Sequence, residues 1–158
     1  MKKQKGFSLI ELLIVVAIIL IIAAIAIPNL LRSRMAANEA SAVGSIRTIN
    51  TAEVTYSTTY PSVGFATLAQ LGGAAGTCAT TATSALACLV DDTLAAGLKS
   101  GYSFVATTSG TQPFVQYTAT GVPTVVGQSG QRGFYSDQSG VIRYDAAGAV
   151  PTNASPAL

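Results

Sequence analysis

The sequence predicts an α+β fold, in which one long N-terminal α-helix continues from a membrane-spanning first half into a second half packed against a four-stranded antiparallel sheet. Three observations predict it. Residues 7–27 are apolar with one charged side chain, residues 31–60 repeat apolar side chains at helical spacing, and residues 101–145 alternate like strands between turn residues. The chain of 158 residues has room for one modest globular domain beside such a helix.

The composition excludes several kinds of chemistry. The sequence has no His and two Cys, so it can supply neither an imidazole base nor a four-thiolate zinc site. Three of the nine basic residues are Lys2, Lys3 and Lys5, and the rest of the chain is close to neutral. We therefore expect no catalytic residues, no cofactor and no specific nucleic-acid partner. A membrane-anchored enzyme is the distant alternative, because no pairing of a nucleophile with a base is visible.

The apolar run is long enough to cross a bilayer. Twenty-one helical residues span roughly 30 Å, which is the thickness of the hydrocarbon layer. The three N-terminal lysines predict a cytoplasmic N-terminus, which places the polar domain after residue 30 outside. A secretory signal peptide has a shorter apolar core followed by a cleavage site, so this longer run does not fit one. A plain signal anchor fits the hydropathy but does not explain the acidic residue within the run.

That acidic residue is Glu11. A carboxylate inside a membrane helix costs roughly 2.5 kcal/mol or more, and no Lys or Arg occurs from Gly6 to Leu31 to pair with it. Cleavage after Gly6 would create an α-amino group on Phe7, which could pair with Glu11 of the same chain or of a neighbour. The alternative is that Glu11 reaches the membrane surface unpaired.

Residues 5–19, Lys-Gly-Phe-Ser-Leu-Ile-Glu-Leu-Leu-Ile-Val-Val-Ala-Ile-Ile, resemble the class III signal of type IV prepilins and of type II secretion pseudopilins. The diagnostic positions are Gly6, Phe7, Leu9 and Glu11. The resemblance implies that residues 1–6 are a leader and that a prepilin peptidase cleaves between Gly6 and Phe7. It also implies that the Phe7 amine is then methylated, and that Glu11 pairs with the Phe7 amine of an adjacent subunit.

Residues 7–30 are expected to form the transmembrane and assembly helix. Pro28 lies near its end, where it removes a backbone donor and predicts a kink or local melting of the helix. The alternative is that the helix ends at this proline. Pro28 also matches the family's proline at the end of the apolar run, and the resemblance implies that the helix loosens there in assembled filaments.

Residues 31–60 are expected to form the amphipathic half of one helix running from about residue 7 to about residue 59. Arg32 and Arg34 are interpreted as solvated charges. The alternatives are that they mark the headgroup region at the outer face of the membrane, or that they form salt bridges with Glu39 or Glu53 of another subunit. A helix this long cannot bury itself on a domain of this size, so part of it needs lipid or neighbouring copies. Its apolar positions are Leu31, Met35, Ala42, Val43, Ile46, Ile49, Ala52 or Glu53, Tyr56 and Tyr60.

Residues 61–100 are interpreted as a connecting loop with helical turns at 67–71 and 91–96, the second with an Asp cap. Cys78 and Cys88 lie between the turns, and because the domain is predicted to be extracytoplasmic, a disulfide is the default. Closing so short a loop stabilises the fold by roughly 3 kcal/mol. In the best-known pilins the disulfide instead pins a C-terminal loop.

Residues 101–145 are expected to form the sheet, with strands near 102–107, 114–118, 133–136 and 141–144. Aromatic side chains from 56 to 65 are expected in the core beneath it. Asp137 fits the first position of a hairpin turn that ends at Gly140. Asp137 and Asp145 are the weak alternative of a calcium site. The tail, residues 146–158, is expected to be mobile.

The function predicted from these features is that of a structural pilin, processed by prepilin peptidase and polymerised as a homopolymer through its N-terminal helix. The expected partners are the inner membrane before assembly and an inner-membrane assembly platform with a cytoplasmic ATPase. The expected location is the inner membrane for the single-pass precursor and then an extracellular pilus filament. A pseudopilin of a type II secretion system, forming a periplasmic pseudopilus, is the alternative. Adhesion, twitching motility and DNA uptake are the expected uses.

Overall fold

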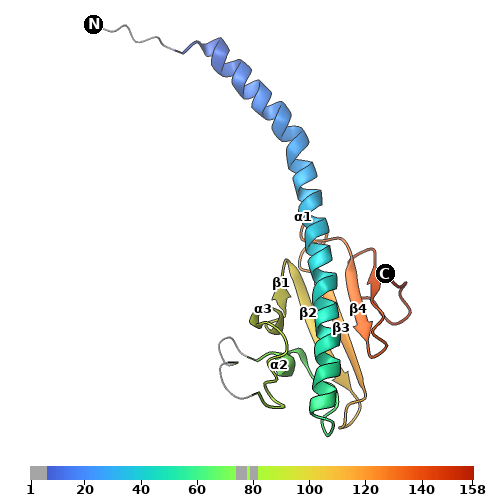
Figure 1. The fold of residues 1–158 in the computed structure, drawn as a ribbon. Helices are drawn as coiled ribbons and strands as arrows, with labels where there is room; N and C mark the ends of the chain where they lie inside the picture. Colours follow the sequence, from blue (N-terminus) through green and yellow to red (C-terminus); the bar gives the residue numbers. More distant parts are fainter. Residues whose placement is uncertain (1–6, 74–77, 79–81) are drawn as a thin grey trace. The chain divides into compact units, whose positions relative to one another are not determined.

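The computed structural model describes residues 7–73, 78 and 82–158, so the expected leader, including Gly6, lies outside the described residues. A boundary between two compact units falls after Arg34, within the long helix α1 (Leu9–Thr59). The second unit contains the rest of α1, two short helices and one sheet (Figure 1).

Helix α1 confirms the predicted helix, with 51 residues in one element. It continues through Pro28, so the alternative of a helix end at this proline is wrong, and the single chain shows no melted turn there. The missing Pro28 donor removes one backbone hydrogen bond without ending the helix. Full burial along α1 begins at Ala42, and the buried positions are Ala42, Val43, Ser45, Ile46, Ile49, Ala52, Glu53 and Tyr56.

The sheet has five antiparallel strands in sequential order, so the prediction of four is wrong. The additional strand is β1 (Leu98–Lys99), which pairs with the start of β2 (Tyr102–Ser109) and has only two residues, too few to show alternation. Strand β3 takes the place of the expected strand at 114–118. It begins at Gln116 and continues to Pro123, because residues 116–123 pair with β2. The strands are β1 (Leu98–Lys99), β2 (Tyr102–Ser109), β3 (Gln116–Pro123), β4 (Gly133–Asp137) and β5 (Arg143–Asp145).

The core of the second unit lies between α1 and the inner face of the sheet (Figure 1). Tyr102, Phe104 and Ala106 point into it from β2, as the alternation predicted. Gly121 of β3 is required beside them, since a Cβ atom there would lie 2.8 Å from the Phe104 ring. Of the aromatic residues expected in the core, Tyr56 is fully buried, and Tyr60 and Phe65 pack against the cluster.

The two predicted helical turns are present as α2 (Leu68–Leu71) and α3 (Asp92–Ala95). Asp91 occupies the N-cap position of α3, but its carboxylate makes no capping hydrogen bond. It accepts hydrogen bonds from the Thr93 hydroxyl and from Lys99 Nζ instead. The helix begins where predicted, but the prediction that an Asp side chain caps it by a hydrogen bond is wrong.

The C-terminal tail, which the sequence led us to expect to be mobile, is bonded to the sheet. Its backbone bonds to the β5 region, with Tyr144 N–H donating to the Pro156 carbonyl and Leu158 N–H donating to the Ile142 carbonyl. Arg143 Nη1 also donates to the Ser155 carbonyl at 2.9 Å. The tail therefore covers backbone groups of β5 that would otherwise form an open sheet edge.

Candidate functional site: an exposed apolar segment

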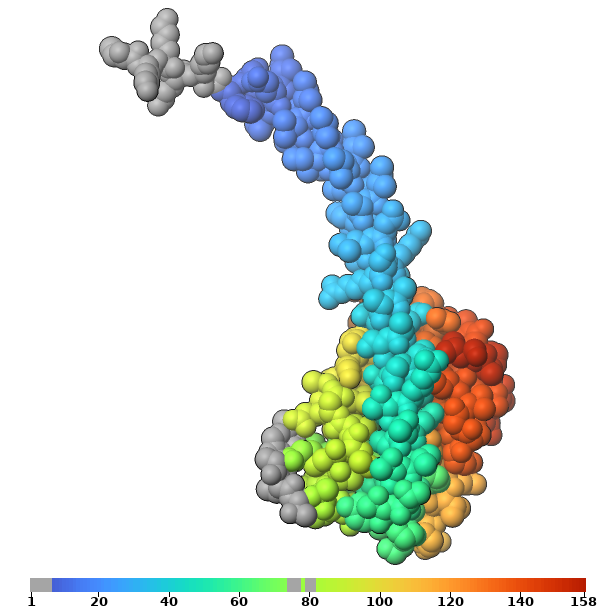
Figure 2. All heavy atoms as spheres, viewed as in Figure 1, coloured from blue at the N-terminus to red at the C-terminus, as the bar shows by residue number. Residues whose placement is uncertain are grey.

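The first unit presents apolar side chains that no described residue covers. The exposed fractions run from 80% for Phe7 down to 44% for Val16 among the large apolar residues from 7 to 31. The segment is one helix thick in Figure 2 (blue). An 18-residue stretch of α1 has a mean hydropathy of 3.3 and no burial, so by length and composition the helix could cross a membrane. An exposed apolar surface of this extent indicates lipid or protein contact.

The segment begins with a hydrogen-bonded helix cap. Ser8 N–H donates to Glu11 Oε2 at 2.8 Å, and the Ser8 carbonyl accepts the Leu12 N–H at 3.2 Å. A Glu three residues after a Ser at the helix start is typical of a capping box, and its negative charge suits the positive end of the helix dipole. The sequence carried this signal as Ser-x-x-Glu before an apolar run, and our reading of the sequence missed it.

Glu11 therefore has a partner within a single chain. One carboxylate oxygen takes the Ser8 N–H bond, and Ser8 directly follows Phe7. An ionised carboxylate has about four lone-pair positions, so this cap leaves acceptor capacity for a further donor. The side chains of Phe7 and Glu11 are both exposed, and the position of Gly6 lies outside the described residues.

The two other glutamates of α1 belong to the second unit. Glu39 Oε1 accepts the N–H groups of Gln131 and Arg132, and its Oε2 lies 2.8 Å from Arg132 Nε. Burial raises the pKa of Glu39, but these hydrogen bonds outweigh burial and hold the pKa below 4.5. The Arg132 guanidinium also lies over the rings of Phe134 and Tyr144, at 5.7 and 5.6 Å.

Glu53 is fully buried, with Oε2 accepting the Ala66 N–H at 2.9 Å. Burial raises the pKa of Glu53 from 4.5 to about 7, although the Ala66 hydrogen bond lowers it. Glu39 and Glu53 are thus both engaged inside their own chain. Arg32 and Arg34 make none of these bonds, and a salt bridge from either of them to another subunit stays a prediction.

Cys78 and Cys88 form the predicted disulfide, with their Cα atoms 5.6 Å apart. The carboxylates of the calcium alternative serve backbone turns. Asp137 Oδ1 accepts the Ser139 N–H at 2.9 Å, and the Gly140 N–H closes the predicted hairpin turn on the Asp137 carbonyl. Asp145 Oδ1 accepts the Ala147 N–H at 2.9 Å. The described residues contain no group of three or more side chains that could hold a metal ion.

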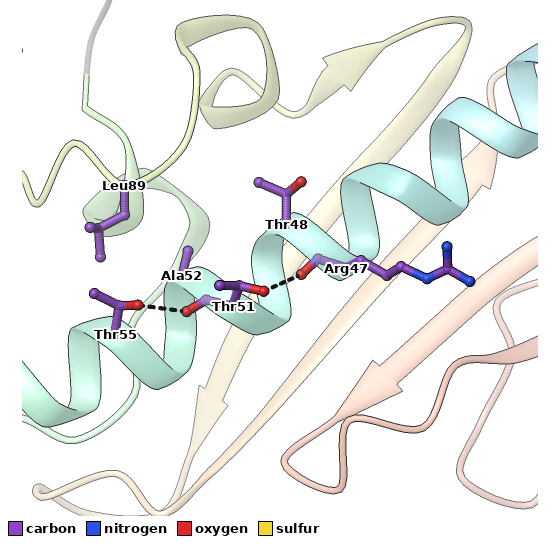
Figure 3. Close-up of a pocket in the computed structure, with 6 residues that line it drawn as sticks. All are labelled: Arg47, Thr48, Thr51, Ala52, Thr55 and Leu89. Atoms are coloured by element: carbon purple, nitrogen blue, oxygen red, sulfur yellow. Dashed lines mark hydrogen bonds between the residues drawn. The ribbon is translucent and has the colours of Figure 1, made fainter.

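A shallow pocket of about 320 Å³ lies beside α1 (Figure 3). Its hydroxyl groups are satisfied within the helix, because Thr51 Oγ1 donates to the Arg47 carbonyl and Thr55 Oγ1 donates to the Thr51 carbonyl. Among the described residues that line the pocket, Arg47 is the only charged one, and they include no pairing of a nucleophile with a base. The lining residues are Arg47, Thr48, Thr51, Ala52, Thr55 and Leu89.

A prepilin-type N-terminal segment and a long helix packed on an antiparallel sheet define the class of pilin-like proteins. Residues 1–27 match a family model described as the prokaryotic N-terminal methylation motif. The chain is 64% identical over 39 residues to the type IV wide pilus major component PilA4 of Thermus thermophilus, covering 25% of this chain and 30% of that protein. It is 43% identical over 54 residues to the type IV major pilin protein PilA of Myxococcus xanthus, covering 34% of this chain and 24% of that protein.

These matches confirm the resemblance found in the sequence. The matched stretches span between about a quarter and a third of the length of the two pilins. No solved structure matches the chain.

Proposed function

We propose that this chain is the structural subunit of a type IV pilus filament. The observation that carries the proposal is the apolar segment from Leu9 to Leu31, in which every large apolar side chain is exposed and Glu11 lies in the first helical turn. Such a surface needs lipid in the precursor and neighbouring copies in a filament. The names of the relatives, a major pilus component and a major pilin, support this function over a secretion pseudopilin.

The same proposal assigns a processing step to the N-terminus. A prepilin peptidase cleaves between Gly6 and Phe7 on the cytoplasmic side and methylates the new Phe7 amine. The precursor crosses the inner membrane once with Lys2, Lys3 and Lys5 inside. Assembly then requires a membrane platform and a cytoplasmic ATPase, which are separate proteins. The assembled filament extends outward from the cell surface.

Helix packing and one ion pair drive the proposed assembly. Lipid tails are as apolar as the helix, so moving the segment from the membrane into a bundle of copies gains little from water exclusion. Close packing of the helices remains, together with a charged pair between Glu11 and the Phe7 amine of the next subunit. In this low-dielectric setting the pair offsets the cost of burying each charge.

The capping bond makes the role of Glu11 testable by substitution. Glu11→Gln keeps an oxygen that can accept the Ser8 N–H but removes the negative charge. We expect normal cleavage at Gly6–Phe7, measured by mass spectrometry, with filament yield reduced at least about tenfold, in line with the loss of one buried charge partner. Glu11→Ala removes both roles and should reduce the yield further.

Glu39→Gln is the matched control, since it also removes the charge of a glutamate of α1 that accepts backbone N–H groups, here those of Gln131 and Arg132. We call the second unit, Met35–Leu158, the head. We expect the filament yield of Glu39→Gln to stay close to that of the unchanged chain under conditions where the head is folded. Filament yield from Glu11→Gln equal to that of Glu39→Gln would show that the charge of Glu11 has no part in assembly.

A further inference from the structure

Glu53 is a buried carboxylate that the proposed function does not use. It lies on the inner face of α1 between Ile49 and Tyr56, and none of its surface is exposed. Its Oε2 accepts the Ala66 N–H at 2.9 Å. Its Oε1 is buried and has no hydrogen-bond partner among the described residues. A buried carboxylate with one satisfied oxygen is costly when it is charged and much less costly when it carries a proton.

The groups that face Glu53 do not compensate a negative charge. Among the described residues, Tyr56 of α1 and Tyr117 of β3 are the titratable groups whose pKa the charge of Glu53 raises, and Tyr60 lies beside Tyr56. Both hydroxyls donate elsewhere, that of Tyr56 to the Ser84 carbonyl and that of Tyr117 to Asn50 Oδ1. The salt bridges among the described residues join other groups, Glu39 with Arg132 and Asp91 with Lys99.

The bond from Glu53 holds a segment that in turn holds the disulfide region. Ala66 directly precedes Thr67, the N-cap of α2. Two carbonyls of α2 accept hydrogen bonds from the segment around Cys88. Ala87 N–H donates to the Gln70 carbonyl at 2.8 Å, and Leu89 N–H donates to the Leu71 carbonyl at 2.7 Å. We call residues 64–72 the docked segment. Loss of the Glu53 proton strengthens the bond from the Ala66 N–H, but it leaves a buried charge with Oε1 unpaired, and the cost of burial outweighs that bond.

We propose that Glu53 is a pH-sensitive attachment point, which keeps the docked segment on α1 while protonated and loosens it when the proton is lost. Burial raises the pKa of Glu53 to about 7, so the change falls near neutral pH. Because the folded head binds this proton more tightly than the open form does, the contribution of Glu53 to stability is largest below pH 4.5 and decreases until the pH passes about 7.

Hydrogen exchange measured by mass spectrometry on the full chain in detergent micelles tests this proposal. After correction for the intrinsic exchange rate, we expect protection of residues 64–72 and 86–89 to fall about tenfold or more between about pH 5.5 and about pH 8.5. In Glu53→Gln, which cannot ionise, protection should not change with pH. In the matched control Glu39→Gln the decrease should remain, because the pKa of Glu39 lies below this range.

Protection that does not change with pH in the unchanged chain would overturn the proposal, as would the same decrease in Glu53→Gln. Should Glu53→Gln fail to fold, the carboxyl carbon resonance of Glu53 in the unchanged chain gives the answer. A titration midpoint near pH 7 that coincides with the loss of protection supports the attachment point. A midpoint below about pH 5, or one that does not coincide with that loss, contradicts it.

Discussion

The two halves of helix α1 are both rich in apolar side chains but differ completely in what covers them. In the first half every large apolar side chain is exposed, whereas Ile46 and Ile49 in the second half are fully buried. The second half packs against the sheet of its own chain, whereas no part of the chain that the structure describes covers the first half. The comparison teaches that an apolar pattern predicts a helix but does not say whether its partner is internal. Exposure in the single chain answers that question.

The glutamates of the two halves differ in a parallel way. Glu11 is exposed and caps the helix start, so it is available to a second chain. Glu53 is buried and bonded to Ala66, so it can act only within its own head. A carboxylate in an apolar stripe is thus exposed at the helix start in one half and part of the internal packing in the other.

The largest effect is expected from a charge in the exposed half. Ile18→Lys should prevent stable membrane insertion and filament formation, because Lys at the centre of a membrane helix costs roughly 2.5–3.5 kcal/mol. The head should unfold at an unchanged denaturant concentration. Membrane fractionation and filament yield measure the effect. Val105→Lys is the matched control, since Val105 and Ile18 are both 51% exposed, and it should leave insertion unchanged. Equal behaviour of the two variants would remove the distinction between the regions.

The next effect should appear in the buried half. Ile49→Ala should lower the free energy of unfolding of the head by about 2–5 kcal/mol, because it removes buried methyl groups and leaves a cavity. Denaturant unfolding followed by circular dichroism measures the change. The same truncation at Ile25, which is exposed, should leave head stability within about 0.5 kcal/mol of the unchanged chain. A comparable loss from both truncations would mean that the first half is also buried in the folded chain.

The disulfide sharpens the comparison within the head. Replacing Cys78 and Cys88 together by Ser should cost roughly 3 kcal/mol of stability, because the unfolded chain regains the freedom of the loop that they close. Chemical denaturation of the oxidised chain, the reduced chain and the double variant measures this. Membrane insertion should not change. Equal stability of the oxidised chain and the double variant would show that the disulfide is not part of what holds the head.

The smallest effect is expected at Glu39. Glu39→Gln should cost roughly 1–2 kcal/mol of head stability, because it weakens charge-assisted hydrogen bonds to Arg132. Since the pKa of Glu39 is lowered in the folded head, its contribution is present above about pH 4.5 and is lost as the pH falls further. Denaturation at neutral and at acidic pH measures both effects. Destabilisation that is larger at acidic pH would contradict the role of the ion pair.

Much of this architecture could be predicted because it follows from repeating patterns. Helical spacing correctly placed Ile46, Ile49 and Tyr56 in the core, and the Asp137 turn followed from its local chemistry. What could not be predicted depends on tertiary contacts. The strand β1 has only two residues, so no pattern announces it, and its pairing with β2 defines it.

The tail and the candidate site show the same limit. The tail has small residues and prolines, yet backbone hydrogen bonds to Tyr144 and Ile142 hold it on β5. The apolar segment and Glu11 were evident in the sequence, because composition alone reveals a charged residue in an apolar run. The Ser8 cap was also present as a pattern and was missed. The burial of Glu53 fits the helical repeat, but its bond to Ala66 needed the fold.

The central claim is that neighbouring copies cover the exposed half of α1 and that Glu11 pairs with the cleaved N-terminus of an adjacent subunit. Electron cryomicroscopy of the native filament tests it most directly. We expect residues 9–31 of many copies to form the filament core, with the Glu11 carboxylate within ion-pair distance of a methylated Phe7 amine on the next chain. A map in which Glu11 contacts only its own Ser8 N–H, or in which this segment lies outside the core, would contradict the account.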